Sequence, residues 1–200
     1  MLYPRTTFLN GQEELVYDNQ LTGYREHLTV HHRVIFLSGA ITGAFEIHDM
    51  VLALDSISHE PIKIVITSPG GDLDSTFLFI DTMKLIQSPI ITLGRYCASA
   101  ACLILASGKE RYLFPHAKTM LHLATGQMGG DYKDFAIQHR LMVSYQNKIV
   151  DILVEAGVKK SREEILIDID RDFWLDPQEA VNYGLADKII TPKIWEGFCQ

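Results

Sequence analysis

Residues 63–93 read KIVITSPGGDLDSTFLFIDTMKLIQSPIITL and contain a complete strand–helix–strand unit. Lys63–Thr67 is a short β-branched run typical of a buried strand, and SPGG at 68–71 ends it. Asp72–Ile86 has a helical pattern, and Pro89–Leu93 forms the next strand. Two strands that are joined through a helix are expected to lie parallel in one sheet.

The same alternation continues on both sides of this unit. Further strands are predicted over Arg33–Ser38, Arg111–Phe114, Thr119–Leu123 and Lys188–Ile190, and further helices over Phe45–Ser56 and Ala98–Ala106. A capping box at Ser161–Glu164 begins one more helix, and Asp176-Pro177 begins another that Gly184 ends. The sequence therefore predicts an α/β domain whose sheet is covered by helices.

Composition limits the possible partners and surroundings. The chain has 200 residues, 47% of them apolar, and its net charge of −7 argues against nucleic-acid binding. Its most apolar stretch, Cys97–Ser107, is too short to span a membrane, which takes about 20 residues. The first 20 residues contain no apolar run of the kind that forms the core of a signal peptide. Three cysteines, an odd number, suit reduced thiols. We expect a cytoplasmic protein, in a bacterial-type cytosol or an organelle stroma or matrix.

The longest helical pattern runs from Asp131 to about Ala156. Such a helix is roughly 39 Å long, more than a domain of this size covers along its whole length. Its second half, from Leu141 to Val154, is apolar on more than one face, which favours contact with another subunit over a central position in a large core. The sequence also predicts how the chain is divided. Residues 1–20 are polar and are expected to form a flexible arm, residues 21–192 the main domain, and residues 193–200 a tail.

Ser99 is the first candidate for chemistry. It lies in YCASAA at 96–101, between the strand Pro89–Leu93 and an apolar helix, and its neighbours are small. One interpretation is an N-cap serine. The other is a nucleophile on a strand-to-helix turn, where small neighbours leave Oγ accessible and the helix N-terminus favours developing negative charge.

Gly70-Gly71 is the second candidate, because it lies between a strand and a helix. An ordinary turn that needs positive φ explains the pair, and so does a turn whose N–H groups stabilise an oxyanion. The phosphate-loop pattern G-x-x-x-x-G-K-[ST] is absent from the chain, which excludes ATP hydrolysis by that route.

His122 is the third candidate, since it interrupts the apolar run Met120–Leu123. A histidine that is satisfied within the core is the alternative, but a polar side chain in such a strand needs a partner. Asp172 can supply a third group. The aspartates at 168–172 lack the remaining residues of a calcium loop, and His27, His31 and His32 lack a matching ligand cluster, so we expect no metal and no cofactor.

Together these segments resemble the Clp protease proteolytic subunit (ClpP) family of serine peptidases, over about Tyr17 to Ile190. The motifs that carry the resemblance are SPGG at 68–71 with IDTM at 80–83, CASAA at 97–101, Pro115 through MLH at 120–122, and RD at 171–172 through EAV at 179–181 and YGLAD at 183–187. Their order matches the family and their spacing is close to it, with the connection between Ser99 and His122 about two residues short.

The resemblance implies a catalytic triad, with Ser99 as nucleophile, His122 as general base and Asp172 as the residue that orients the histidine. It also implies an oxyanion hole formed by the backbone N–H groups of Gly71 and Ala100. A serine needs a neutral imidazole to take its proton as it attacks a carbonyl, which is why these residue types belong together.

The implied fold is a ClpP/crotonase-like spiral of β-β-α units, in which a protruding handle helix, about residues 131–156, interdigitates between two stacked seven-subunit rings. Residues 1–20 would then form an axial arm of a tetradecamer. Unfolded polypeptide, fed by a separate AAA+ unfoldase, would lie extended between the segment after Gly71 and the one around Thr125-Gly126. Asp170-Arg171 matches positions that link the rings.

The chain departs from the family pattern at several places. Leu123-Ala124 replaces the usual Gln-Pro after the histidine, and Ala100 replaces a common methionine. Lys63 and Val65 stand where the family often has aromatic residues that dock the unfoldase. Two alternative functions stay open: a catalytically silent ring scaffold, and an acyl-CoA enzyme of the crotonase superfamily, which shares the fold and the oxyanion turn.

Overall fold

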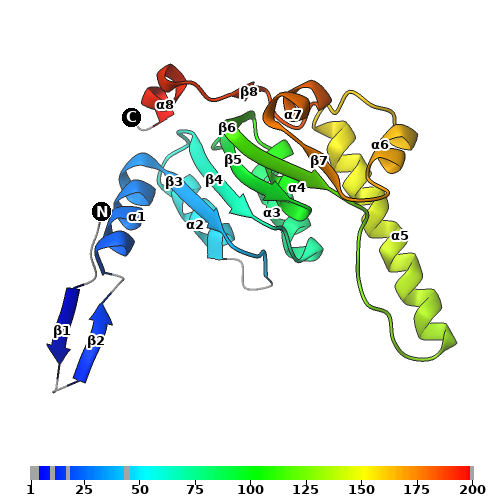
Figure 1. Cartoon of the computed structure of the whole chain (residues 1–200), viewed down its shortest axis with the longest axis horizontal. Coiled ribbons are helices and arrows are strands. Elements are labelled where there is room, and N and C mark those ends of the chain that lie inside the picture. Colours follow the sequence, from blue (N-terminus) through cyan, green and yellow to red (C-terminus); the bar gives the residue numbers. More distant parts are fainter. Residues whose placement is uncertain (1–4, 10–11, 17–18, 43–45, 199–200) are drawn as a thin grey trace.

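The computed structural model describes residues 5–9, 12–16, 19–42 and 46–198 (Figure 1). The strands are β1 (Arg5–Leu9), β2 (Gln12–Val16), β3 (Val34–Ser38), β4 (Ile62–Ser68), β5 (Ile90–Ala98), β6 (Glu110–Leu121), β7 (Phe173–Leu175) and β8 (Lys188–Ile189). The helices are α1 (Asn19–His32), α2 (Glu46–Ile57), α3 (Leu73–Leu85), α4 (Ala100–Ala106), α5 (Tyr132–Glu155), α6 (Arg162–Asp168), α7 (Pro177–Tyr183) and α8 (Pro192–Phe198). Within the described residues, no helix combines the length and apolarity needed to cross a lipid bilayer.

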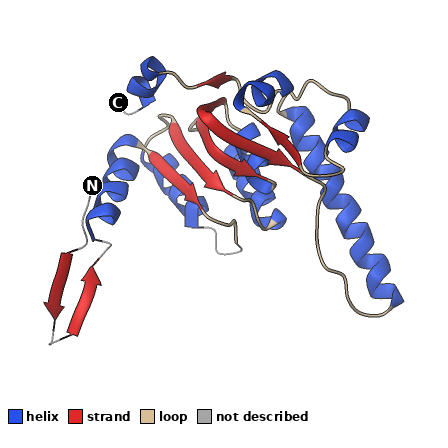
Figure 2. Ribbon diagram, in the orientation of Figure 1, coloured by secondary structure: helices blue, strands red, loops and turns tan. Residues whose placement is uncertain are grey.

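One sheet organises the main domain. Its strand order is β3-β4-β5-β6-β7, with β8 paired to β6 as well. Strands β3 to β6 are mutually parallel and are joined through helices, whereas β7 runs antiparallel to β6 (Figure 2). The predicted α/β class with a mainly parallel sheet is therefore confirmed.

Alternation along the strands gives the sheet two apolar faces. Ile35 and Leu37 of β3 and Ile64 of β4 belong to the large core, which also contains the apolar sides of α2, α3 and α4. These helices lie on one side of the sheet in Figure 1. Val34 and Val65 point the other way, into a smaller cluster that Phe198 of α8 joins. Successive side chains of a strand point to opposite faces, so one sequence run supplies both clusters.

Strand β6 differs from the prediction. Arg111–Phe114 and Thr119–Leu123 were expected as two strands, but a single strand runs from Glu110 to Leu121. Its register with β5 jumps from Leu113 opposite Gly94 to Lys118 opposite Tyr96, so residues 114–117 bulge out of the pairing. Pro115 lies in that bulge, where its missing N–H costs no ladder bond. The bulge also lets the two halves of β6 pair with different strands, β8 and β7.

Strand β5 also extends further than expected. It continues past Leu93 to Ala98, so the helix predicted from Ala98 begins at Ala100 instead. The glycine and polar residues at 94–96 carry little strand signal by themselves. Pairing with β4 and with β6 on either side keeps this stretch extended.

The two ends of the chain contain elements that the sequence reading omitted. Within the expected arm, β1 and β2 form a separate antiparallel two-stranded sheet, and α1 follows from Asn19. The dipeptide Asn10-Gly11, typical of hairpin connections, is the signal that was overlooked. Residues 193–198 of the expected tail belong to α8. The division into arm, domain and tail, and an axial position for the arm, stay predictions.

Helix α5 occupies the stretch expected to be the longest helix. Asp131 caps its start with a reciprocal capping box, and Ala156 is its C-cap. Only Ile149, Val150 and Leu153 of its 24 residues are buried, all in its last two turns. The N-terminal half projects away from the sheet (Figure 1). Apolar side chains on that half have no covering element in the described chain.

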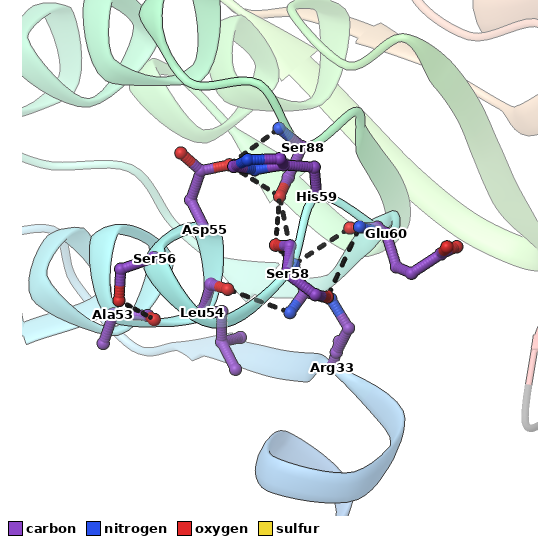
Figure 3. A network of polar contacts seen from close by, with 9 residues as sticks. All are labelled: Arg33, Ala53, Leu54, Asp55, Ser56, Ser58, His59, Glu60 and Ser88. Atoms are coloured by element: carbon purple, nitrogen blue, oxygen red, sulfur yellow. Dashed lines mark hydrogen bonds and ion pairs between the residues drawn. The ribbon is translucent and has the colours of Figure 1, made fainter.

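A polar network closes the end of α2 (Figure 3). The Arg33 guanidinium donates to the carbonyl oxygen of Leu54 in the last turn of α2 and to those of Ser58 and Glu60 just beyond the helix, at 2.9–3.0 Å. Arg33 Nη2 also donates to Ser88 Oγ at 3.0 Å. The network thereby ties α2 to the loop that precedes β5.

Asp55 is the anionic centre of this network. Its Oδ1 accepts from the Ser88 hydroxyl at 2.7 Å and from the Ser88 N–H at 2.8 Å. These bonds, the hydroxyl bond foremost, lower the pKa of Asp55 to about 2. Because this value lies below the ordinary aspartate pKa of about 3.9, the ionised carboxylate stabilises the fold above that ordinary value. The contribution is lost as the pH falls towards 2.

An Asp55→Asn variant is therefore expected to have a lower free energy of unfolding than the wild type near pH 6, and a smaller deficit near pH 3. Urea unfolding followed by circular dichroism at both pH values measures the difference. Asp81→Asn, which removes an exposed carboxylate from α3, serves as control. A deficit of equal size at the two pH values would contradict the role of Asp55.

Candidate active site

Ser99 occupies the sharp turn between β5 and α4. Its backbone angles are φ 54° and ψ −126°, a conformation that costs a non-glycine residue about 1–3 kcal/mol. The Ser99 N–H donates to the Met120 carbonyl at 2.7 Å, which anchors the turn to β6. The side chain takes the N-cap position of α4 but makes no capping hydrogen bond. Its hydroxyl is thus not committed to closing the helix.

Glycine is required beside this turn because two backbones approach each other closely. A Cβ on Gly70 would lie 2.6 Å from the Ala98 carbonyl oxygen and 2.8 Å from Ser99 Cβ. Gly70 also has φ +91°, which L side chains rarely adopt. The β4–α3 turn can therefore pack against the Ser99 turn only with a glycine at this position.

Gly71 and Ala100 each present a backbone N–H near Ser99. Ile41 forms hydrogen bonds with the two residues on either side of Gly71 and not with Gly71 itself. The Ile41 N–H donates to the Gly70 carbonyl, and the Asp72 N–H donates to the Ile41 carbonyl. Ala100 is the first residue of α4, where an N–H has no intrahelical partner. In the described part of the chain, no hydrogen bond engages either N–H. Both donors are available to a ligand.

A small pocket of about 40 Å³ brings most of the predicted site residues together. It is lined by Gly71, Leu73, Ser99, Ala100, Leu103, Leu121, His122, Leu123, Ala124, Thr125 and Ile149. A hydroxyl, an imidazole and two free N–H donors thus share one pocket with apolar walls. This is the set of groups that acyl transfer through a serine uses.

His122 follows the last residue of β6, and its imidazole hydrogen-bonds its neighbour. Nδ1 is bonded to the Leu123 carbonyl oxygen, which can only accept. In the neutral ring this places the proton on Nδ1 and leaves Nε2 as the acceptor, which is the tautomer a general base needs. No hydrogen bond joins Ser99 to His122 among the described residues.

The structure places Asp172 near His122 along the backbone but does not pair the two side chains. The register of β6 with β7 ends at Leu121 opposite Phe173, so the next residues on each strand are His122 and Asp172. Asp172 is exposed, and its carboxylate has no hydrogen bond or ion pair within the described residues. Four of the five predicted residues therefore share the pocket, and Asp172 does not line it.

Gln146 of α5 is a residue that the sequence reading missed. Its Oε1 accepts from the Ala124 N–H at 2.8 Å and so helps to hold the segment after His122. The Leu123 N–H donates to the Ile169 carbonyl at 3.0 Å on the other side. A proline at position 124 would lack the N–H that Gln146 binds. The signal in the sequence was a glutamine within the apolar half of the long helix.

The two cysteines beside Ser99 are poor candidates for a nucleophile. Cys97 and Cys102 are fully buried, and neither lines the pocket. Burial raises the pKa of Cys102 to about 12 and raises that of Cys97 as well. Both stay protonated near neutral pH, and a thiol is much less nucleophilic than a thiolate.

Other clusters of reactive residue types do not form competing sites. In the ranges that the structure describes, no group of three or more His, Cys, Asp or Glu is placed to hold a metal ion. The Asp55, His59 and Ser88 cluster in Figure 3 has the residue types of a triad but the wrong connections. There Asp55 is bonded to both other side chains, and no bond joins His59 to Ser88.

Comparison with known proteins finds one family model and several similar chains. A family model described as Clp protease matches residues 21–193. The chain is 32% identical over 201 residues to ATP-dependent Clp protease proteolytic subunit 1 of Rhodopirellula baltica. The alignment covers 91% of this chain and 88% of the relative. It is 38% identical over 174 residues to the protein of the same name from Protochlamydia amoebophila, covering 83% and 84%. It is 34% identical over 164 residues to proteolytic subunit 2 of Pseudomonas aeruginosa, covering 80% and 81%.

Proposed function

The chain belongs to the Clp protease family, and we propose that it is a serine endopeptidase whose nucleophile is Ser99. Membership in the family makes it a peptidase subunit. One observation supports the serine mechanism above the others: the strained Ser99 turn, His122 and the two unengaged N–H groups face one pocket. A strained nucleophile turn next to free backbone donors is typical of serine hydrolases.

In the proposed reaction, Ser99 Oγ attacks the carbonyl carbon of a peptide bond while His122 Nε2 takes its proton. The N–H groups of Gly71 and Ala100 donate to the oxyanion of the tetrahedral intermediate. The C–N bond then breaks, and the imidazolium returns the proton to the leaving amine. Water attacks the resulting ester by the same route, which releases the acid and restores Ser99.

Asp172 is proposed to orient the imidazole and to stabilise its charged form. For this role, the His122 ring must exchange the Leu123 carbonyl for the Asp172 carboxylate. The pairing of Leu121 with Phe173 supports this exchange, because His122 follows Leu121 and Asp172 precedes Phe173 on the antiparallel strand. A neutral carbonyl fixes the tautomer but supplies no compensating charge for the imidazolium. The pair is therefore expected to form as the enzyme reaches its active state.

The peptidase is proposed to work as a closed particle of two stacked seven-subunit rings with a separate AAA+ unfoldase, in a cytosol-like compartment. The relatives are named ATP-dependent, whereas this chain has no phosphate-loop motif, so ATP hydrolysis belongs to a partner. Unfolded polypeptide is the expected substrate. The N-terminal half of α5 supports the ring contact, with Phe135 46% and Ile137 57% exposed, whereas the apolar second half, from which the contact was predicted, buries Ile149, Val150 and Leu153 within its own chain.

The assembly is expected to depend on these apolar residues of α5. Wild-type protein at micromolar concentration should sediment as a particle many times heavier than the 22.6 kDa chain. A Phe135→Glu/Ile137→Glu double variant should shift to smaller species, because burying an unpaired charge at an interface costs several kcal/mol. Glu163→Lys, a charge change at an exposed position on α6, is the control. A monomeric wild type would contradict the assembly.

A fluorophosphonate probe, which reacts with activated serines, tests the proposed function directly. Labelling of the wild type and its loss in Ser99→Ala are expected. An assembled particle without labelling would favour the silent scaffold. Turnover of an acyl-CoA that survives Ser99→Ala would favour the crotonase-type alternative.

A further inference from the structure

A second, larger cleft continues from the Ser99 pocket. It has a volume of about 300 Å³ and shares Gly71, Leu73 and Thr125 with that pocket. The remaining lining comes from the start of α3, the loop before α5 and the N-terminal half of α5: Asp72, Asp74, Gly126, Gln127, Met128, Gln138, Leu141, Met142 and Tyr145. Gly71 therefore lines both the Ser99 pocket and this cleft.

The cleft is held in place by contacts across it. The Tyr145 hydroxyl of α5 donates to Asp74 Oδ2 of α3 at 2.7 Å. Gln138 forms two hydrogen bonds with the Gly129 backbone, 3.0 Å through Oε1 and 2.7 Å through Nε2, which fastens the loop to α5. A pre-formed cleft selects its ligand without the cost of ordering its own walls.

The walls of the cleft combine apolar surface with negative charge. Leu73, Leu141 and Met142 supply aliphatic area, and the lining contains two carboxylates and no lysine, arginine or histidine. Asp72 Oδ1 is occupied by Ser75, and Asp74 Oδ2 by Tyr145, which leaves one oxygen of each carboxylate without a bond among the described residues. Lys148, one turn further along α5, lies over the Phe77 ring and does not line the cleft.

We propose that this cleft receives a basic side chain, lysine or arginine, from the substrate residue whose carbonyl Ser99 attacks. The methylenes of such a side chain match the aliphatic walls, and its cationic head matches the free carboxylate oxygens of Asp74 and Asp72. The side chain that enters the cleft belongs to the substrate residue whose carbonyl group is attacked. The oxygen of that carbonyl would bind at the Gly71 N–H, and Gly71 also lines the cleft. This specificity rests on the proposed peptidase function.

Three fluorogenic peptides that differ only in this residue, as lysine, norleucine or glutamate, test the proposal. We expect kcat/KM to fall in that order, with lysine favoured over glutamate by about tenfold or more. Raising the salt to about 1 M shortens the Debye length to about 3 Å and should reduce this ratio. A wild type that prefers norleucine or glutamate would overturn the proposal.

Variants of Asp74 separate specificity from folding. Asp74→Asn keeps an oxygen for the Tyr145 hydroxyl and should lower the lysine-to-glutamate ratio of kcat/KM several-fold. Asp74→Lys should reverse the preference towards glutamate. Asp81→Asn, on the same helix but outside the cleft, should leave the ratio as in the wild type.

The failures of the two ideas are distinguishable. Hydrolysis that depends on Ser99 but shows the same ratio in Asp74→Asn as in the wild type would overturn the basic specificity alone. Absence of hydrolysis for all three peptides, together with absence of fluorophosphonate labelling, would overturn the peptidase function and the specificity with it.

Discussion

Replacing Ser99 with alanine is expected to lower kcat for a fluorogenic peptide by about 10⁴-fold or more, because the attacking oxygen is lost and only binding and the oxyanion donors remain. The substitution removes one oxygen from a side chain that makes no capping bond. The fold and the assembled particle should therefore survive, which sedimentation and circular dichroism can verify on the same sample.

Ser107→Ala provides a matched control at the other end of α4. The Ser107 hydroxyl donates to the Leu103 carbonyl at 2.8 Å, as expected for a structural serine. This variant should keep its peptidase activity and lose at most about 1 kcal/mol of stability. Peptide hydrolysis that is equal in Ser99→Ala and wild type, with contaminating peptidases excluded, would rule out Ser99 as nucleophile.

Gly71→Ala is expected to have the second largest effect, lowering kcat by about 10²–10³-fold and destabilising the fold. A Cβ at this position would lie 2.1 Å from the Ile41 carbonyl oxygen and 2.8 Å from the Ile41 nitrogen. Both are backbone atoms, so no side-chain rotation relieves the conflict. The turn must move, and the Gly71 N–H moves away from the position where the oxyanion develops.

Gly157→Ala distinguishes this displacement from backbone strain alone. Gly157 has φ +86°, and an added Cβ would meet no atom within 4 Å. This variant should lose about 1 kcal/mol of stability and keep its activity. Measuring both kcat and the urea midpoint of unfolding for each variant tests this: both quantities should fall in Gly71→Ala, and only the midpoint should fall in Gly157→Ala. Full activity in a folded Gly71→Ala protein would exclude Gly71 as an oxyanion donor.

The local signals in the sequence predicted most of the helices well. The cap Asp176, the first-turn Pro177 and the left-handed Gly184 bound α7 as predicted, and the capping box at Ser161 opens α6. Each of these signals acts within a few residues, so its effect does not depend on the rest of the fold. The three-residue strand β7 lacks such a signal, and its position follows from pairing with β6. Helix α8 does have one, because Thr191 precedes Pro192 at its start and Thr191 Oγ1 accepts from the Ile194 N–H at 3.4 Å.

The candidate site divides in the same way. Ser99, His122 and Gly71 were recognisable because each residue type is unusual where it stands in the chain. Gln146 stands out only as a glutamine within an apolar stretch, and its role could not be predicted, because its partner, the Ala124 N–H, lies 22 residues away and any residue other than proline supplies one. The bond of His122 Nδ1 to the Leu123 carbonyl has no mark in the sequence either.

The amino-acid sequence alone determined the alternation of strands and helices and the chemical groups at positions 71, 99, 122 and 172, since both are properties of residues and their near neighbours. Only the tertiary structure decided that β6 bulges at residues 114–117 and continues to pair with β7 as far as Leu121 opposite Phe173, the neighbours of His122 and Asp172. It also decided which groups share a pocket and which carboxylates line the adjoining cleft. Those outcomes depend on contacts between residues far apart in the chain. The free energy of such contacts cannot be inferred from the pattern of neighbouring residues in the sequence.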